Sequence, residues 1–199
     1  MELKTETEIK ILEAAKKVFV EKGFDGTRMQ DIANELGMHK ALLHYYYRSK
    51  EKLFDAVFRD SFARFFPKMS EIMASELSLK AKIESFVENY TNLLIENPHL
   101  PLFVFQEIQR SPEKMVELVR EFGMKPEYFV NSVQKEIAAG TIRPINPLHL
   151  MVNILGMCLF PFIARPVLMG FIFENDRVKI DAFLKERKKE VIEFMMKSL

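Results

Sequence analysis

The sequence predicts an all-helical protein, and three observations lead to this fold class. Apolar residues recur at the three- and four-residue spacing of a buried helical face in one segment after another. Glycine and proline fall between these segments and not within clear strands. No stretch combines sustained apolar–polar alternation with the turn residues of a β-hairpin. A chain of 199 residues suits one domain or two small ones and can bury a substantial core.

The composition narrows the classes of function. The formal net charge is only +1, so any basic surface for nucleic acid must be local. A single cysteine excludes an internal disulfide framework and fits a reducing cytoplasm. The charged stretch Met1–Lys10 lacks the apolar run of a secretory signal peptide. We therefore expect a cytoplasmic protein.

The first predicted helix runs from about Thr5 to Lys22, because its apolar residues share one face, and Gly23 ends it. Thr27 is expected to be the N-cap of the second helix, with Gln30 at the spacing of a capping box. Gly37 can adopt the left-handed conformation that ends this helix.

A short helix from about His39 to Tyr46 follows the glycine turn, and Ser49 caps the helix after it. Histidine is a poor N-cap, so the short helix depends on packing or on DNA for its order. Two helices joined by a tight glycine turn form a helix-turn-helix, whose second helix can enter the DNA major groove. Residues 38–52 carry four cations and one acidic residue, a formal charge of +3. This local charge fits a phosphate backbone.

The residues of this region carry a specific resemblance. They are Thr27, Asp31-Ile32-Ala33, Leu36-Gly37-Met38, Tyr46-Tyr47 and Ser49-Lys50-Glu51-Lys52-Leu53. The run resembles the DNA-binding signature of TetR-type transcriptional regulators and, with the upstream Val18-Phe19 and Gly23-Phe24, covers about the first third of the chain. The sequence departs from the family pattern at three positions, where the family usually has Ser or Thr, Gly and Tyr. These positions are His39, Ala41 and His44.

The resemblance and the basic flanks predict a set of DNA contacts. Tyr46, Lys50 and Thr27 are expected at phosphates, although without the surrounding motif Tyr46 would be interpreted as packing and Lys50 as a surface lysine. Lys40 is a candidate for guanine acceptors and Ala41 for a thymine methyl group. The complete set of DNA-binding candidates is Thr27, Arg28, His39, Lys40, Ala41, His44, Tyr45, Tyr46 and Lys50.

Caps and prolines predict the later helices. The helix from Lys50 carries a run of phenylalanines as far as Phe66, and Pro67 is expected to kink or break it. Ser111-Pro112 and Asn146-Pro147 each place a capping residue before a proline at the first helical position. The other predicted segments are residues 78–97, 102–110, 126–139, 148–164 and 177–197.

The segment Leu148–Ala164 contains no Asp, Glu, Lys or Arg. Its 17 residues reach the lower limit for a membrane span, roughly 17 residues. His149, Asn153 and Pro161 within it favour a helix buried in a core or subunit interface instead.

The later helices are rich in Phe and Met, which suit a pocket for a largely apolar ligand. Glu107 is expected on a solvated helix face, with a role toward a cationic ligand as the alternative, and Asn153 either bonds across helices or binds a ligand. Cys158 is expected to be buried and inert. The ligand-binding candidates are Phe86, Tyr90, Phe103, Gln106, Glu107, Asn153, Met157 and Phe160.

No catalytic constellation, metal-ligand spacing or cofactor motif stands out, so we expect neither an enzyme nor a bound metal or cofactor. We predict a helix-turn-helix domain over residues 1–48 and a ligand-binding and dimerisation body over residues 49–199. The resemblance implies a homodimer joined mainly by the last two helices, with an inverted-repeat operator and a small apolar effector. It also implies repression as the usual outcome. The alternatives are control by a protein partner without a ligand pocket and, more remotely, a helical enzyme.

Overall fold

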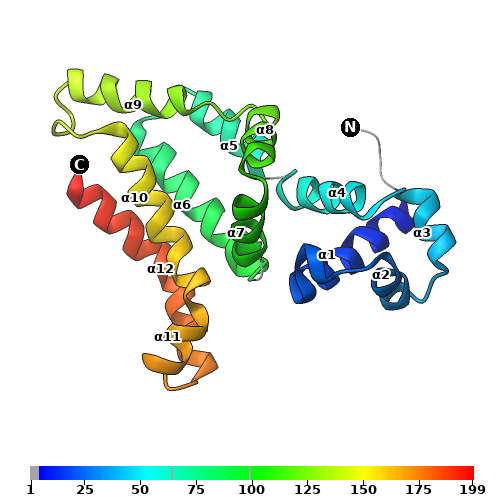
Figure 1. Ribbon diagram of the computed structural model, residues 1–199. Helices are drawn as coiled ribbons and strands as arrows, with labels where there is room; N and C mark the ends of the chain where they lie inside the picture. The colour runs from blue at the N-terminus through cyan, green and yellow to red at the C-terminus, as the bar shows by residue number, and fades with distance from the viewer. Residues whose placement is uncertain (1–4, 64, 99) are drawn as a thin grey trace. The chain divides into compact units, whose positions relative to one another are not determined.

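The computed structural model describes residues 5–63, 65–98 and 100–199. Within these residues the chain forms twelve helices and no strand, which confirms the predicted fold class (Figure 1). The chain packs as two units, Met1–Arg64 with Leu102–Leu118 and Phe65–Pro101 with Val119–Leu199. These are called the first and second unit below.

The first unit begins with four helices, α1 (Glu6–Gly26), α2 (Met29–Leu36), α3 (Lys40–Tyr46) and α4 (Lys50–Phe62). Most of α7 (Leu100–Arg110) and the first residues of α8 (Pro112–Glu121) pack with them. This unit therefore differs from the predicted division after residue 48, because α4 and a segment distant in sequence share its packing.

An aromatic cluster around Phe54 of α4 forms the centre of the first unit. The Phe54 ring centroid lies 4.9 Å from that of Phe19, 5.0 Å from that of Phe24 and 5.0 Å from that of Phe103. Edge-to-face and tilted pairs at these distances add to the stability from burial alone. Phe103 of α7 thereby packs against α4, and it is only 2% exposed.

Glu107 and Arg110 anchor the end of α7 in the same unit. The Arg110 guanidinium donates two hydrogen bonds to the Glu107 carboxylate, at 2.8 and 2.9 Å. The guanidinium carbon also lies 3.9 Å from the Phe24 ring centroid, a cation–π arrangement. Glu107 is 4% exposed, so its expected position on a solvated face is wrong. Arg110 supplies the partner that a buried carboxylate requires.

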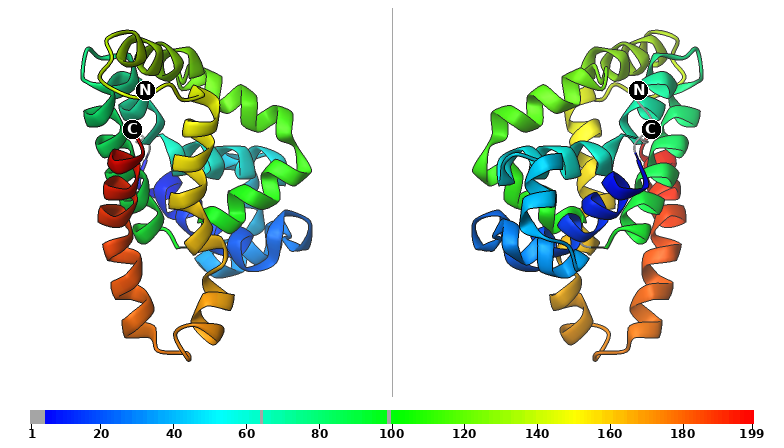
Figure 2. Two further views of the ribbon diagram at one scale, coloured as in Figure 1. Left: turned by 90° about the vertical axis from the view of Figure 1, so that its left-hand side faces the viewer. Right: turned by 90° about the vertical axis from the view of Figure 1, so that its right-hand side faces the viewer.

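The second unit contains α5 (Phe65–Ala74), α6 (Leu79–Glu96), α9 (Pro126–Ala138), α10 (Pro147–Ile163), α11 (Arg165–Phe171) and α12 (Arg177–Ser198). Helices α6, α10 and α12 pack against one another, and α9 lies across one end of α6 and α10 (Figure 2). Their core consists of apolar side chains, including Ile83, Val87, Val133, Ile154 and Val191.

Side-chain caps start two helices of the second unit, and the cap at Asn146 is the one that the sequence predicts. The Ser78 hydroxyl accepts a hydrogen bond from the Ala81 N–H, and the Asn146 side chain accepts from the N–H of Leu148. The loop before α10 is tied to the end of α12, because the Arg143 N–H donates to the Leu199 carbonyl at 2.9 Å.

Two helix breaks differ from the sequence prediction. Helix α4 ends at Phe62 and α5 begins at Phe65, so Pro67 lies in the first turn of α5 and does not make the break. A first-turn proline is tolerated because its missing N–H would have no helical partner. Helix α11 was not among the predicted segments, and it precedes a turn through Glu174 and Asn175 at φ of 49° and 64°.

Among the described residues, no single helix is long and apolar enough to cross a membrane. Helices α10 and α11 together meet the length and composition criteria, but they are bent by 62° at their junction.

Candidate nucleic-acid interface

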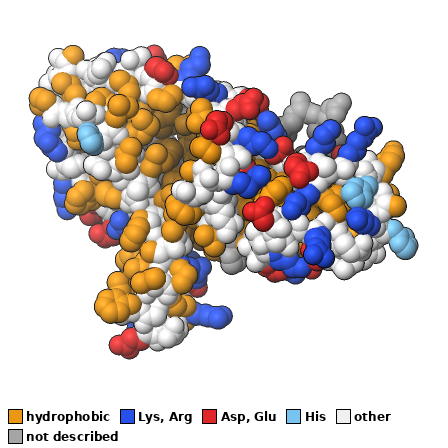
Figure 3. All heavy atoms as spheres, viewed as in Figure 1, with side chains coloured by type: hydrophobic (Ala, Val, Ile, Leu, Met, Phe, Trp, Pro, Cys, Tyr) orange, Lys and Arg blue, Asp and Glu red, His pale blue; other side chains and the backbone are white. Residues whose placement is uncertain are grey.

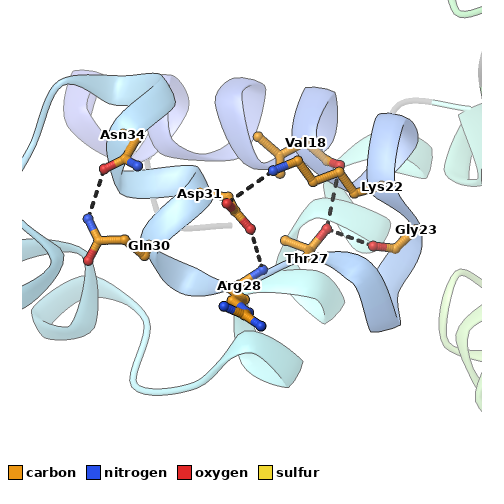
Figure 4. Close-up of polar contacts among 8 residues, drawn as sticks. All are labelled: Val18, Lys22, Gly23, Thr27, Arg28, Gln30, Asp31 and Asn34. Carbon is orange, nitrogen blue, oxygen red and sulfur yellow. Dashed lines mark hydrogen bonds and ion pairs between the residues drawn. The ribbon is translucent and has the colours of Figure 1, made fainter.

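Thr27 lies between α1 and α2, where the sequence predicts an N-cap and a phosphate contact. Arg28 is the N-cap of α2 instead, so the predicted capping role of Thr27 is wrong. Thr27 is 1% exposed, and its hydroxyl donates to the Gly23 carbonyl oxygen at 2.6 Å (Figure 4). Gln30, the expected capping partner, donates to the Asn34 side-chain oxygen at 2.8 Å. The Thr27 side chain therefore forms a hydrogen bond at the kink of α1 at Gly23. Its phosphate contact stays a prediction.

Asp31 performs the capping function that was assigned to Gln30. Its carboxylate accepts a hydrogen bond from the Arg28 N–H at 2.8 Å and lies 3.0 Å from the Lys22 ammonium. The Arg28 bond, followed by the Lys22 contact, lowers the pKa of Asp31 below its ordinary value. A signal was available in the sequence, because a carboxylate at the third helical position can accept a hydrogen bond from the N-cap N–H, as Glu does in a capping box. Asp31 thus joins the start of α2 to the end of α1.

The turn between α2 and α3 has the conformation that the sequence predicts. Gly37 adopts a left-handed conformation with φ of 63°, and the Met38 N–H donates to the Ala33 carbonyl at 3.0 Å. His39 is the N-cap of α3 and makes no side-chain capping bond, as expected for histidine. Leu43 is completely buried and anchors the short helix to the unit.

The remaining candidates on α3 are exposed or partly buried. Lys40 and Ala41 are exposed, and Tyr45 is 81% exposed. Tyr46 is partly buried, and its ring lies edge to face with that of Tyr45 at 5.5 Å. The Nδ1 atom of His44 lies 3.3 Å from the Arg48 carbonyl oxygen, to which it can donate a hydrogen bond. These positions leave the outer side of α3 free to enter a groove.

Lys50 has a contact inside the unit that the sequence did not indicate. Its ammonium donates to the Phe24 carbonyl oxygen at 2.8 Å and lies 4.3 Å from the Phe24 ring centroid. Ser49 caps α4 as predicted, accepting from the Lys52 N–H at 3.2 Å. The start of α4 is thereby fixed to the end of α1. The phosphate contact of Lys50 stays a prediction.

The structure divides the ligand-binding candidates between the two units. Phe86 and Tyr90 lie together on α6, with ring centroids 5.3 Å apart, and Met157 packs against the same core. Phe160 is 64% exposed, and Asn153 is also exposed. The other three candidates belong to the first unit, and they are Phe103, Gln106 and Glu107. The eight candidates therefore do not all line one pocket within a single unit.

A small pocket of about 100 Å³ lies within the first unit, next to Glu107 and Lys114. Ligand sites usually have roughly 300 Å³ or more, so this pocket is too small for a typical effector. The Lys114 ammonium and the Asp55 carboxylate at its rim are 3.5 Å apart.

Cys158 is buried in the second unit, as the sequence predicts. Burial raises the pKa of its thiol to about 11. A thiol with this pKa is almost entirely protonated at neutral pH and is a weak nucleophile. Burial also raises the pKa of the Tyr90 hydroxyl above its ordinary range. The hydroxyl of Tyr90 therefore stays neutral at neutral pH.

The glycine turn, the buried anchor Leu43 and the exposed outer side of α3 define a helix-turn-helix DNA-binding protein. Two family models match the chain, "Bacterial regulatory proteins, tetR family" over residues 11–57 and "Tetracyclin repressor-like, C-terminal domain" over residues 73–199. The chain belongs to the TetR family of DNA-binding transcriptional regulators.

Relatives and solved structures agree with this family. The chain is 28% identical over 151 residues to the HTH-type transcriptional regulator YfiR of Bacillus subtilis, covering 74% of this chain and 73% of that protein. It is 30% identical over 97 residues to the HTH-type transcriptional repressor KstR2 of Rhodococcus jostii, covering 49% of this chain and 47% of that protein. The crystal structure of FadR from Bacillus subtilis in complex with stearoyl-CoA superposes with a TM-score of 0.66 at 16% identity, covering 96% of this chain and 98% of that one.

Replacing Asp31 with asparagine should lower the thermal stability of the protein at pH 7. The pKa of Asp31 is lowered in the folded state, so its stabilisation is present above the ordinary carboxyl value of 3.8 and is lost as the pH falls through the folded value. The difference in melting temperature between wild type and Asp31→Asn should therefore shrink on acidification. Circular dichroism melts from pH 7 down to pH 3 measure it.

Asp25→Asn is the matched control, because Asp25 is an exposed carboxylate near the end of α1. It should change the melting temperature little at any pH in this range. An Asp31→Asn deficit that is as large at pH 3 as at pH 7 would contradict the assigned role of the carboxylate.

Proposed function

We propose that this regulator is a homodimeric repressor that binds an inverted-repeat operator in the cytoplasm and responds to a small, largely apolar effector. The observation that carries the proposal is the exposed face of α3, which the buried Leu43 anchors to the first unit, in a chain of the TetR family. The similarity to the repressor KstR2 supports repression as the outcome.

The uncovered face of α10 supports dimerisation. Leu148, Val152 and Phe160 are 56%, 64% and 64% exposed, and residues 148–164 contain no charged side chain. Hydrophobic side chains gather over α10 and α11 in Figure 3. An apolar surface that continues along a helix is unusual on a monomer. Two copies of this face related by a two-fold axis would cover each other and would present two reading helices to the halves of an inverted repeat.

The last helix contributes less to this face than the sequence suggests. Ile180 and Met195 of α12 are 0% and 2% exposed and belong to the protomer core. Phe194 is 62% exposed, but most of the other exposed positions of α12 are charged. We therefore assign the centre of the proposed interface to α10.

Aromatic packing in the second unit supports an apolar effector. Phe65, Phe86 and Tyr90 form one group, with the Phe65 centroid 6.1 Å from that of Phe86 and 5.4 Å from that of Tyr90. Such groups accommodate aliphatic or aromatic molecules with few hydrogen bonds. The stearoyl-CoA bound to FadR, a protein of similar fold, has a long aliphatic chain and supports the same class of ligand. Control of DNA binding requires that the effector bind the DNA-competent and DNA-incompetent states with different affinity.

The protein should bind duplex DNA with an affinity that falls as salt rises, because phosphate contacts release counterions. Lys50→Gln keeps a donor for the Phe24 carbonyl but removes a positive charge. It should flatten the plot of log K against log salt by about 0.9, the contribution of one phosphate contact. Fluorescence anisotropy at several salt concentrations measures the slope.

Lys80→Gln is the control, since Lys80 is an exposed lysine of the second unit. It should leave the slope unchanged. Wild-type protein that shows no salt-dependent binding to any duplex would refute the proposed operator binding. An unchanged slope in Lys50→Gln would refute only the phosphate contact of Lys50.

Combining Leu148→Asp with Val152→Asp should convert the dimer to monomers, because the carboxylates would be buried in the two-fold interface without partners. Both side chains are more than half exposed in the protomer, so helical content should be retained. Sedimentation velocity and circular dichroism measure the two properties. Val116→Asp, at a 48% exposed position of the first unit, is the control and should stay dimeric. Wild-type protein that sediments as a monomer at micromolar concentration would contradict the proposal.

An apolar effector should stabilise the protein and change its operator affinity together. At 100 times its dissociation constant, a ligand that binds only the folded state adds about 2.7 kcal/mol. The operator should alter effector affinity by the same factor as the effector alters operator affinity. A thermal-shift screen of fatty acyl and aromatic compounds, followed by DNA titration with each hit, measures both. Phe86→Ala should weaken binding of the hits.

Two outcomes of the screen would change the proposal in different ways. Compounds that stabilise the protein and leave operator affinity unchanged are not effectors. Operator binding that no compound alters would instead favour control by a protein partner.

A further inference from the structure

The outer side of α3 is apolar at its centre. Leu42 is 46% exposed and Tyr45 is 81% exposed, and Ala41 is also exposed. Tyr45 follows Ala41 by four positions and Leu42 by three, so the three side chains are neighbours on one helical face. Leu43, which lies between Leu42 and Tyr45 in the sequence, is completely buried and so fixes the inward side of α3. We call Ala41, Leu42 and Tyr45 the reading face.

Polar groups lie at the margins of the reading face and not at its centre. Lys40 is exposed at the start of α3, while His44 is partly buried beside the Arg48 carbonyl. The Tyr45 ring is held edge to face against Tyr46, with an angle of 88° between the rings. The cations of residues 38–52, with their formal charge of +3, lie along the chain on both sides of this apolar centre. This charge distribution complements a phosphate backbone on either side of a groove.

The chemistry of the major groove limits what an apolar face can recognise. The base edges there present hydrogen-bond donors and acceptors, and the thymine methyl group is the apolar feature among them. Leucine or alanine opposite a guanine or cytosine edge would displace water without replacing its hydrogen bonds, which is unfavourable. Against a thymine methyl group, the same side chains bury apolar surface on both partners.

We propose that the reading face recognises thymine methyl groups, so that each operator half-site presents thymines to Ala41 and Leu42. Lys40 at the margin supplies a hydrogen-bonding contact, and Tyr45 extends the apolar surface by one turn. This inference rests on the proposed operator binding through α3, and it names the base that α3 recognises.

The test uses DNA selected by the protein from a random pool. Each thymine of the selected half-site is replaced in turn by deoxyuridine, which lacks the methyl group and keeps the same hydrogen-bonding edge. Wild-type protein should lose affinity about threefold to fourfold at a contacted thymine, the factor expected for exposing one buried methyl group. Anisotropy titrations at constant salt measure the loss.

Leu42→Ala assigns the contact to a side chain. Leu42 is exposed, so this variant should fold like wild type, and circular dichroism checks that it does. It should lose sensitivity to deoxyuridine at one thymine of each half-site and keep sensitivity at the thymine opposite Ala41. Leu77→Ala, at a 49% exposed position of the second unit, should keep the full wild-type pattern.

The outcomes separate this inference from the proposed function. Failure to select any DNA sequence would refute operator binding and with it the inference. A selected operator whose deoxyuridine substitutions all change affinity by less than about twofold would overturn only the inference. An unchanged deoxyuridine pattern in Leu42→Ala would overturn the assignment to the reading face.

Discussion

The packing of Phe54 is the interaction on which the first unit depends. Its ring contacts Phe19 and Phe24 of α1 and Phe103 of α7, so one side chain joins three helices that are far apart in sequence. Arg110 covers the Phe24 ring and binds the buried Glu107, which adds a charge-assisted contact at the same place. Because α7 packs with α1 and α4, displacement of α7 would disturb the helices that hold the helix-turn-helix. The unit that reads DNA therefore includes a segment well outside the helix-turn-helix.

The reading helix itself has few local sources of stability. It has seven residues, and its N-cap makes no side-chain hydrogen bond. Short helices are marginal in isolation, so the order of α3 comes from tertiary contacts. The buried Leu43 supplies one of them, and Asp31 supports the preceding helix through Arg28 and Lys22. Because tertiary contacts hold α3 in place, its outer side can carry exposed apolar side chains.

The second unit buries one side of α10 and leaves the other uncovered. Leu150, Ile154 and Cys158 face the core at 1%, 3% and 0% exposure, while Val152 on the other side is 64% exposed. A helix that is apolar all round needs a covering on both sides. The sequence predicted this burial in a core or an interface, and the structure shows that the protomer provides only the core half. The proposed two-fold contact would provide the other half.

Local chemistry in the sequence was sufficient for several helix starts and for the helix-turn-helix. Ser49 and Asn146 cap the helices that they were predicted to cap, and Gly37 makes the predicted turn, because each acts on backbone groups within a few residues. The burial and contacts of Thr27, Glu107 and Phe103 depend on residues that only the tertiary structure brings near. Thr27 is buried at the kink at Gly23, and Glu107 and Phe103 belong to the DNA-reading unit. A sequence pattern shows which face of a helix is apolar, but the choice of the surface that covers this face depends on the whole fold.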